Sequence, residues 1–183
     1  MAALLVSLPM QLACQIMCAA NSTNENVNFV QNTLISKQNS FSLPEGYISF
    51  PDIGLAYKSH HTKAVTWDEA RSRCIQDDAT MAVIDSWKTL EYIMKVKPIT
   101  SDPYLGIHRF FNKEEWTSVK NGLPVPFVPW GPDQPARNAD LNCGAMWADG
   151  RGLAAASCDG YKRHFLCEIS VPRLTTISSD KTA

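Results

Sequence analysis

The chain has 183 residues, with 17 Lys and Arg against 18 Asp and Glu, and it is 45% hydrophobic and 19% charged. The length suits one domain with short extensions, and the apolar fraction is too high for a disordered chain. A formal charge of −1 excludes bulk electrostatic attraction to nucleic acid or anionic lipid. Six cysteines in a chain of this size indicate disulfides, a metal site or a catalytic thiol.

The first segment, residues 1–20, has no charged side chain and ends in the small residues Ala19 and Ala20. An apolar stretch of this length with a small-residue end predicts a secretory signal peptide, although the usual basic residue near the start is missing. The alternative is a single buried helix. Removal of the signal would take Cys14 and Cys18 with it and leave four cysteines in an extracellular protein.

Three further segments differ in composition. Residues 21–45 are rich in Asn, Ser and Gln and predict a polar flexible arm, with a glycosylation sequon at Asn21. Residues 171–183 are mostly polar and predict a disordered tail. The folded domain is therefore expected at 46–170.

The first element of that domain is a strand around 57–61, followed by a helix that begins at Trp67. Thr66 precedes the helix and Glu69 follows three residues later, which is the capping-box pattern. Helical spacing directs one apolar face to the core, formed by Trp67, Ala70, Cys74 and Ile75.

A second helix follows the apolar run 81–84. Asp85 or Ser86 can cap its first turn, since both accept hydrogen bonds from backbone N–H groups. The spacing predicts that it buries Leu90, Ile93 and Met94.

The second half of the domain contains strand-like runs around one long irregular loop. Strands are expected at 104–108, 144–147, 153–157 and 164–169. Residues 112–143 hold Gly and Pro at short intervals with no helical period, and loops of this length usually carry function. Helices first and strands later predict an α+β fold.

These residues resemble, in order, the pattern of a C-type lectin-like domain over about 46–169. The matching motifs are Tyr57-Lys58, Thr66-Trp67 to Cys74, Met81 to Ser86, Leu105-Gly106-Ile107, Trp116, Trp130-Gly131, Gln134-Pro135, Cys143, and Cys158 to Cys167. Within that family, the sequence resembles the secreted immune lectins, or immulectins, of moths and butterflies. The resemblance implies two helices flanking small antiparallel sheets, a long ligand loop and two disulfides.

The resemblance also implies the pairing of the four remaining cysteines, Cys74 with Cys167 and Cys143 with Cys158. The residues alone leave three connectivities open. They do favour bridges, because the spacing contains no Cys-x-x-Cys zinc knuckle and four cysteines after a signal peptide suit an oxidising compartment.

In the family, a calcium ion in the long loop binds sugar hydroxyls, and a triplet such as Gln-Pro-Asp supplies ligands around a cis peptide bond. The triplet falls on 134–136, where Gln134 offers an amide oxygen and Ala136 offers none. Three other ligand positions fall on residues without a side-chain oxygen, namely Leu141, Ala154 and Ala155. Arg137, next to the triplet, adds a positive charge where the cation would bind. We therefore predict no cofactor, and no calcium held by the usual ligand set.

A shifted calcium site is the alternative, built from Asp133, Asn138, Asp140 and Asn142. Calcium accepts these oxygen types, but site affinity follows ligand charge and only two of the four are acids. The same residues also suit a solvated turn in which Asx side chains bond the backbone. Both interpretations stay open from the sequence.

The ligand-binding residues predicted from this loop region are Gln134, Asn138, Asp140, Asn142 and Trp147. Trp147 is expected to line a surface groove, whereas Trp116 and Trp130 suit core anchors of the loop better than sugar platforms. No catalytic residues are predicted, because none of the common hydrolase, zinc-protease, P-loop or dinucleotide motifs occurs.

The sequence thus predicts a secreted, non-enzymatic recognition protein of innate immunity. Its expected partner is microbial surface glycan or lipopolysaccharide, with neither nucleic acid binding nor a membrane span. The alternative is a lectin-like domain that binds a protein partner through the same loop face. Chelator-sensitive sugar binding would support the usual mechanism, and silence on sugars would support the alternative.

Overall fold

The computed structural model describes residues 42–173. The predicted leader 1–20 and most of the predicted arm and tail lie outside these residues. In chain order the elements are β1 (Ile48–Phe50), β2 (Leu55–Val65), α3 (Trp67–Gln76), β3 (Thr80–Met81), α4 (Trp87–Val96), β4 (Tyr104–His108), β5 (Thr117–Ser118), β6 (Cys143–Met146), β7 (Leu153–Ala156) and β8 (Arg163–Ser170). The α+β prediction is confirmed.

Helix α3 begins where the capping pattern predicts. The Thr66 hydroxyl accepts a hydrogen bond from the N–H of Glu69 at 3.3 Å, and Trp67, Ala70 and Cys74 are buried. The prediction for Ile75 was wrong, since its side chain is 50% exposed. It lies next to Cys74 at the edge of the buried stripe, where one helical step of about 100° turns a side chain toward solvent.

Helix α4 starts at a reciprocal cap between Ser86 and Thr89. Ile93 is fully buried and Leu90 packs against the core, as predicted. Met94 was expected inside but is 38% exposed. The short helix has one buried face, and Ile93 occupies it.

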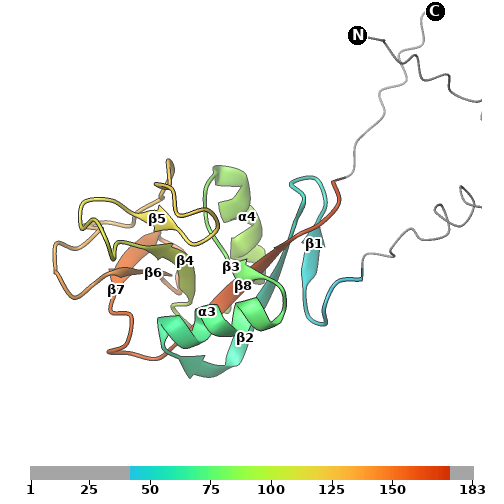
Figure 1. Cartoon of the computed structure of the whole chain (residues 1–183), viewed down its shortest axis with the longest axis horizontal. Helices are drawn as coiled ribbons and strands as arrows, with labels where there is room; N and C mark the ends of the chain where they lie inside the picture. The colour runs from blue at the N-terminus through green and yellow to red at the C-terminus, as the bar shows by residue number, and fades with distance from the viewer. Residues whose placement is uncertain (1–41, 174–183) are drawn as a thin grey trace, which may run out of the picture. The chain divides into compact units, whose positions relative to one another are not determined.

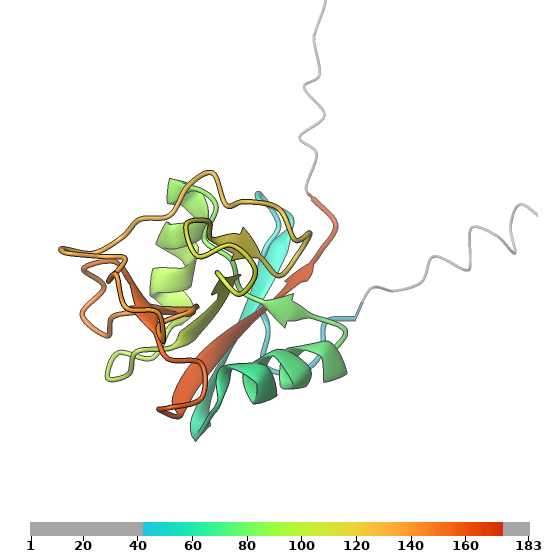
Figure 2. The same cartoon turned by 60° about the vertical axis from the view of Figure 1, so that its left-hand side comes forward.

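The sheet is centred on β8. Its strand order is β1-β2-β8-β4-β6-β7, with β3 also paired to β8 and β5 to β4. Figures 1 and 2 show α3 and α4 beside this sheet, with β8 running through the middle of the fold. The short strands β1, β3 and β5 were not predicted from the sequence, because two or three residues give no periodic pattern.

Two disulfides fasten this arrangement, with the pairing that the family resemblance implies. Cys74–Cys167 joins α3 to β8, and Cys143–Cys158 joins the start of β6 to the turn after β7. All four cysteines belong to, or pack against, one apolar cluster that includes Trp67, Tyr104 and Phe165. The bridges therefore fasten α3 to the central strand and the start of β6 to the turn after β7, around a shared core.

The half-buried His60 is a titratable group packed against an aromatic ring. The His60 ring stacks on Phe165, with 4.3 Å between ring centroids and 7° between planes. Its buried Nε2 has no hydrogen-bond partner among the described residues. Burial, helped by the nearby Lys58, lowers the pKa of His60 below its ordinary value of 6.5.

Lowering the pH should therefore cost folding free energy. Below about pH 6.5 the unfolded chain binds a proton that the native His60 resists, so stability present above this pH is lost as the pH falls. Chemical denaturation at about pH 7.5 and about pH 5.5 should show a smaller loss for His60→Phe, which keeps the stacking but does not titrate. Equal losses in both proteins would contradict this role for His60.

Candidate functional site

The long loop between β4 and β6 leaves and re-enters the sheet at one place. His108, the last residue of β4, is the register partner of Cys143, the first of β6. The backbone N–H of Arg109 continues this pairing by donating to the Asn142 carbonyl at 2.9 Å. Residues 109–142 are thus closed at their base by strand pairing, with β5 folded back onto β4.

The far part of the loop is tied to β7. The N–H of Leu153 donates to the Pro129 carbonyl, and the N–H of Gly131 donates to the Leu153 carbonyl, both at 2.9 Å. These bonds place residues 129–131 beside β7. They also bring the following residues, which include Gln134, against the sheet.

Between the loop's two ends lies a cavity of about 710 Å³, which we call the loop cavity. Its walls combine aromatic, cationic and amide side chains. The lining residues are Arg109, Lys113, Glu114, Trp116, Trp130, Gln134, Pro135, Arg137, Asn138 and Ala139.

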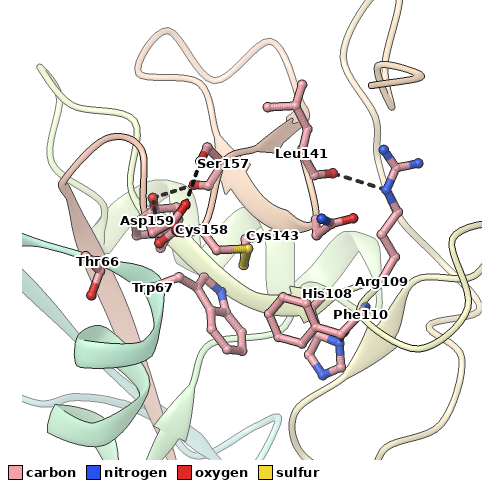
Figure 3. Close-up of a disulfide and its surroundings, with 12 residues drawn as sticks. Thr66, Trp67, His108, Arg109, Phe110, Leu141, Cys143, Ser157, Cys158 and Asp159 are labelled. Atoms are coloured by element: carbon pink, nitrogen blue, oxygen red, sulfur yellow. Dashed lines mark hydrogen bonds between the residues drawn. A yellow bond between two sulfur atoms is a disulfide. The ribbon is translucent and has the colours of Figure 1, made fainter. Parts of the chain in front are cut away.

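Arg109 organises the wall of this cavity. Its guanidinium donates to four backbone carbonyls: Nε to Leu141 at 3.1 Å, Nη1 to Lys113 at 3.3 Å, and Nη2 to Ala136 at 3.1 Å and Asn138 at 2.7 Å. Figure 3 shows the first of these bonds. Only 8% of Arg109 is exposed. A buried cation thus gathers carbonyls from both ends of the loop.

Gln134 serves a similar structural role on the β7 side. Its Oε1 accepts from the N–H groups of Ala136 at 3.1 Å and Ala155 at 3.0 Å. The peptide bond between Gln134 and Pro135 is cis. The amide oxygen that a cation would use therefore already faces two positive N–H dipoles.

Trp116 and Trp130 meet in a tilted edge-to-face pair, with 4.8 Å between ring centroids and 61° between planes. Trp116 is buried and the Arg109 guanidinium lies 5.2 Å from its ring centroid. Trp130 is half-buried. Both therefore anchor the loop, as predicted, and in addition both line the loop cavity.

The structure separates the predicted ligand-binding residues. Gln134 and Asn138 line the loop cavity, whereas Asp140 and Asn142 line a second cavity of about 650 Å³. This second cavity lies near the Cys143–Cys158 disulfide, and Figure 3 shows that disulfide and its surroundings. Trp147 lines neither cavity. Its ring packs over the backbone of Gly131, with the Arg151 guanidinium 3.9 Å from its centroid.

The Asx side chains of the loop bond to the chain itself. Asn138 Oδ1 accepts from the N–H of Asp140 at 2.9 Å. Asn142 Nδ2 donates to the Ala139 carbonyl at 2.8 Å, and its Oδ1 accepts from Lys113 Nζ at 2.9 Å. This is the pattern of a turn stabilised by its own amides. Within residues 42–173, no three His, Cys, Asp or Glu side chains converge to hold a metal ion.

The donor set at the usual calcium position does not fit that ion. Calcium takes about six to eight oxygen ligands, but Ala154 and Ala155 are buried in β7 and carry only methyl groups. Gln134 is engaged by two N–H donors, and the Arg109 charge lies against the same loop.

Arg109, Lys113 and Glu114 were not predicted as cavity residues from the sequence. Arg109 directly follows a predicted strand and begins the long loop, and a charged residue at that position is the one signal in the sequence. Its partners, however, are carbonyls up to 32 residues away, and backbone acceptors leave no mark in the sequence.

The role of Arg109 can be measured against an exposed cation of the same loop. Arg109→Met should lower the free energy of unfolding by about 2–4 kcal/mol, because it leaves several carbonyls without their charged donor. Arg137→Met, the matched control on an exposed side chain, should stay within about 0.5 kcal/mol of the parent. Chemical denaturation with tryptophan fluorescence gives both values, and equal effects would refute the role.

Comparison with known proteins agrees with this architecture. A model of the Lectin C-type domain matches residues 63–169. The hemolymph lipopolysaccharide-binding protein of Periplaneta americana is 33% identical over 146 residues, which cover 71% of this chain and 54% of that protein. The human C-type lectin domain family 17, member A is 28% identical over 103 residues, covering 56% and 26%. The chain thus spans about half the length, or less, of these relatives.

Solved structures show the same fold. A calcium-independent type II antifreeze protein superposes with a TM-score of 0.63 at 21% identity, covering 73% of this chain and 98% of its own. The carbohydrate-recognition domain of mouse scavenger receptor C-type lectin gives 0.63 at 19% identity, covering 71% and 99%. With the family model matching more than half of its residues, the chain belongs to the C-type lectin domain family.

Proposed function

We propose that this protein is a secreted recognition protein that binds microbial glycan or lipopolysaccharide in the loop cavity, without calcium at the usual site and without catalysis. The observation that carries the proposal is the cavity itself. It offers the indole of Trp130 beside the hydrogen-bonding groups of Asn138 and Lys113. Sugars are bound in proteins by such a pairing of an aromatic face with directed polar groups.

The relative from Periplaneta americana supports the ligand class, because its name describes a lipopolysaccharide-binding protein of hemolymph. The domain family supports recognition rather than chemistry. An innate immune role is part of the same proposal.

Calcium independence is supported by the way the loop is held. Arg109 supplies one fixed positive charge to carbonyls on both sides of the cavity, which is the kind of cross-linking that a bound cation performs. The guanidinium is covalently attached, so the loop needs no ion from solution to keep this arrangement.

Secretion is supported by the two disulfides, which persist in oxidising compartments and are rare in the cytosol. The predicted signal peptide at 1–20 belongs to the same proposal. Among residues 42–173, no helix combines the length and the apolar character needed to cross a bilayer.

A protein partner is the second candidate function, and exposed aromatic side chains favour it. Phe111 is 93% exposed and Phe110 39% exposed. Phe110 stacks on His108, with 4.5 Å between centroids, and meets Trp67 edge-on at 5.4 Å. This cluster borders the second cavity rather than the loop cavity, so the two candidate functions use different surfaces.

Glycan-array binding with calcium and with a calcium-selective chelator tests the proposal. Saccharide signal should persist unchanged in chelator. Trp130→Leu should weaken it by about tenfold or more, as loss of a stacking and hydrogen-bonding aromatic contact predicts. The matched control Trp87→Leu, at a tryptophan that is 71% exposed and lies outside the cavity, should bind like the parent.

Two results would contradict the proposal. Loss of signal in chelator would show that a bound calcium ion is required. Silence toward every saccharide, from a protein whose melting temperature shows it to be folded, would favour the protein-binding alternative.

A further inference from the structure

The loop cavity has an unbalanced charge. Three cationic side chains line it, Arg109, Lys113 and Arg137, against the single carboxylate of Glu114. The whole chain is nearly neutral, with a formal charge of −1, so the excess is a local property of this wall. Within the described part of the chain, no carboxylate lies within 4 Å of the charged nitrogens of these three residues, although eight other such ion pairs form.

The Arg109 charge is buried but not neutralised. Its four hydrogen bonds end on neutral carbonyls and use four of the five guanidinium N–H groups. A charge that is largely removed from water interacts more strongly with its surroundings than an exposed one. The buried guanidinium therefore places one fixed positive charge at the cavity wall.

Lys113 and Arg137 add two further positive charges to the same cavity. Both side chains are exposed at the cavity. Lys113 Nζ donates to the neutral amide oxygen of Asn142 at 2.9 Å, which fixes the ammonium beside the loop while two of its three N–H donors stay free for other acceptors. A guanidinium such as that of Arg137 binds planar or tetrahedral oxyanions through two parallel hydrogen bonds.

We propose that the loop cavity selects saccharides that carry an oxyanion, either a phosphate ester or a carboxylate, and that Lys113 and Arg137 contact this group. Trp130 packs against the sugar ring, while the buried guanidinium of Arg109 contributes its fixed charge at the cavity wall. The inference rests on the proposed function and adds a ligand class to it.

The test uses the full chain and matched saccharide pairs in calorimetry with chelator present. One pair is a phosphorylated oligosaccharide and its phosphatase-treated product, and the other is a uronic acid oligosaccharide and its neutral hexose counterpart. The acidic member of at least one pair should bind about tenfold or more tightly, since each charge-assisted contact contributes appreciable free energy. The pair that shows the preference identifies the oxyanion.

The double variant Lys113→Met/Arg137→Met should bind acidic and neutral members alike. A matched control, Lys63→Met/Lys162→Met, removes the same charge from exposed lysines that do not line the loop cavity and should keep the preference. Thermal melting confirms that both variants are folded.

Outcomes separate this inference from the function beneath it. Equal binding of acidic and neutral saccharides by the parent overturns the oxyanion inference and leaves glycan recognition standing. Equal loss of preference in both double variants also overturns it, because a general surface charge would then be responsible. Failure of all four saccharides to bind, from a protein that gives signal on the glycan array, overturns the inference alone. Silence on the array as well overturns the proposed function.

Discussion

The ligand loop depends on one buried guanidinium. Arg109 follows the last residue of β4 and donates to carbonyls at Lys113, Ala136, Asn138 and Leu141. Left without a donor, a buried carbonyl costs free energy, so these bonds favour one conformation of a segment that has little regular structure. The loop cavity lies between the two stretches of the loop that Arg109 connects.

The sheet puts Arg109 where it can do this. Strands β4 and β6 pair at His108 and Cys143, and the Cys143–Cys158 disulfide fastens that pair to the turn after β7. The base of the loop is therefore held in place. The Arg109 side chain, which starts at this base, reaches carbonyls near both ends of the loop. Gln134 performs the matching task from the far side by accepting from the N–H of Ala155 on β7. Fold, loop shape and cavity form one connected arrangement.

The sequence predicted the elements that have a local signature. The cap at Thr66, strand 104–108 and the buried face around Cys74 follow from residue type and spacing alone. Ile75 and Met94 were misplaced because a short helix buries a narrower stripe than its apolar residues suggest. The site was harder to predict: the lack of side-chain oxygen at Ala136, Ala154 and Ala155 was visible in the sequence, but the bonds from Arg109 to the loop carbonyls were not. Arg109 acts on backbone acceptors that any sequence would offer, and Gln134, predicted as a ligand-binding residue, lines the loop cavity and also ties the loop to β7.

Amide hydrogen exchange in the loop, with calcium and with chelator, tests most directly whether Arg109 holds the loop in place of an ion. The N–H groups of Ala136, Asp140 and Leu141 each donate to acceptors within the loop, so their protection reports its order. Calcium should leave their exchange rates unchanged in the parent protein, and Arg109→Met should raise the rates in both conditions. Slowing of these amides by calcium in the parent would contradict the claim, because it would show an ion doing the work assigned to the guanidinium.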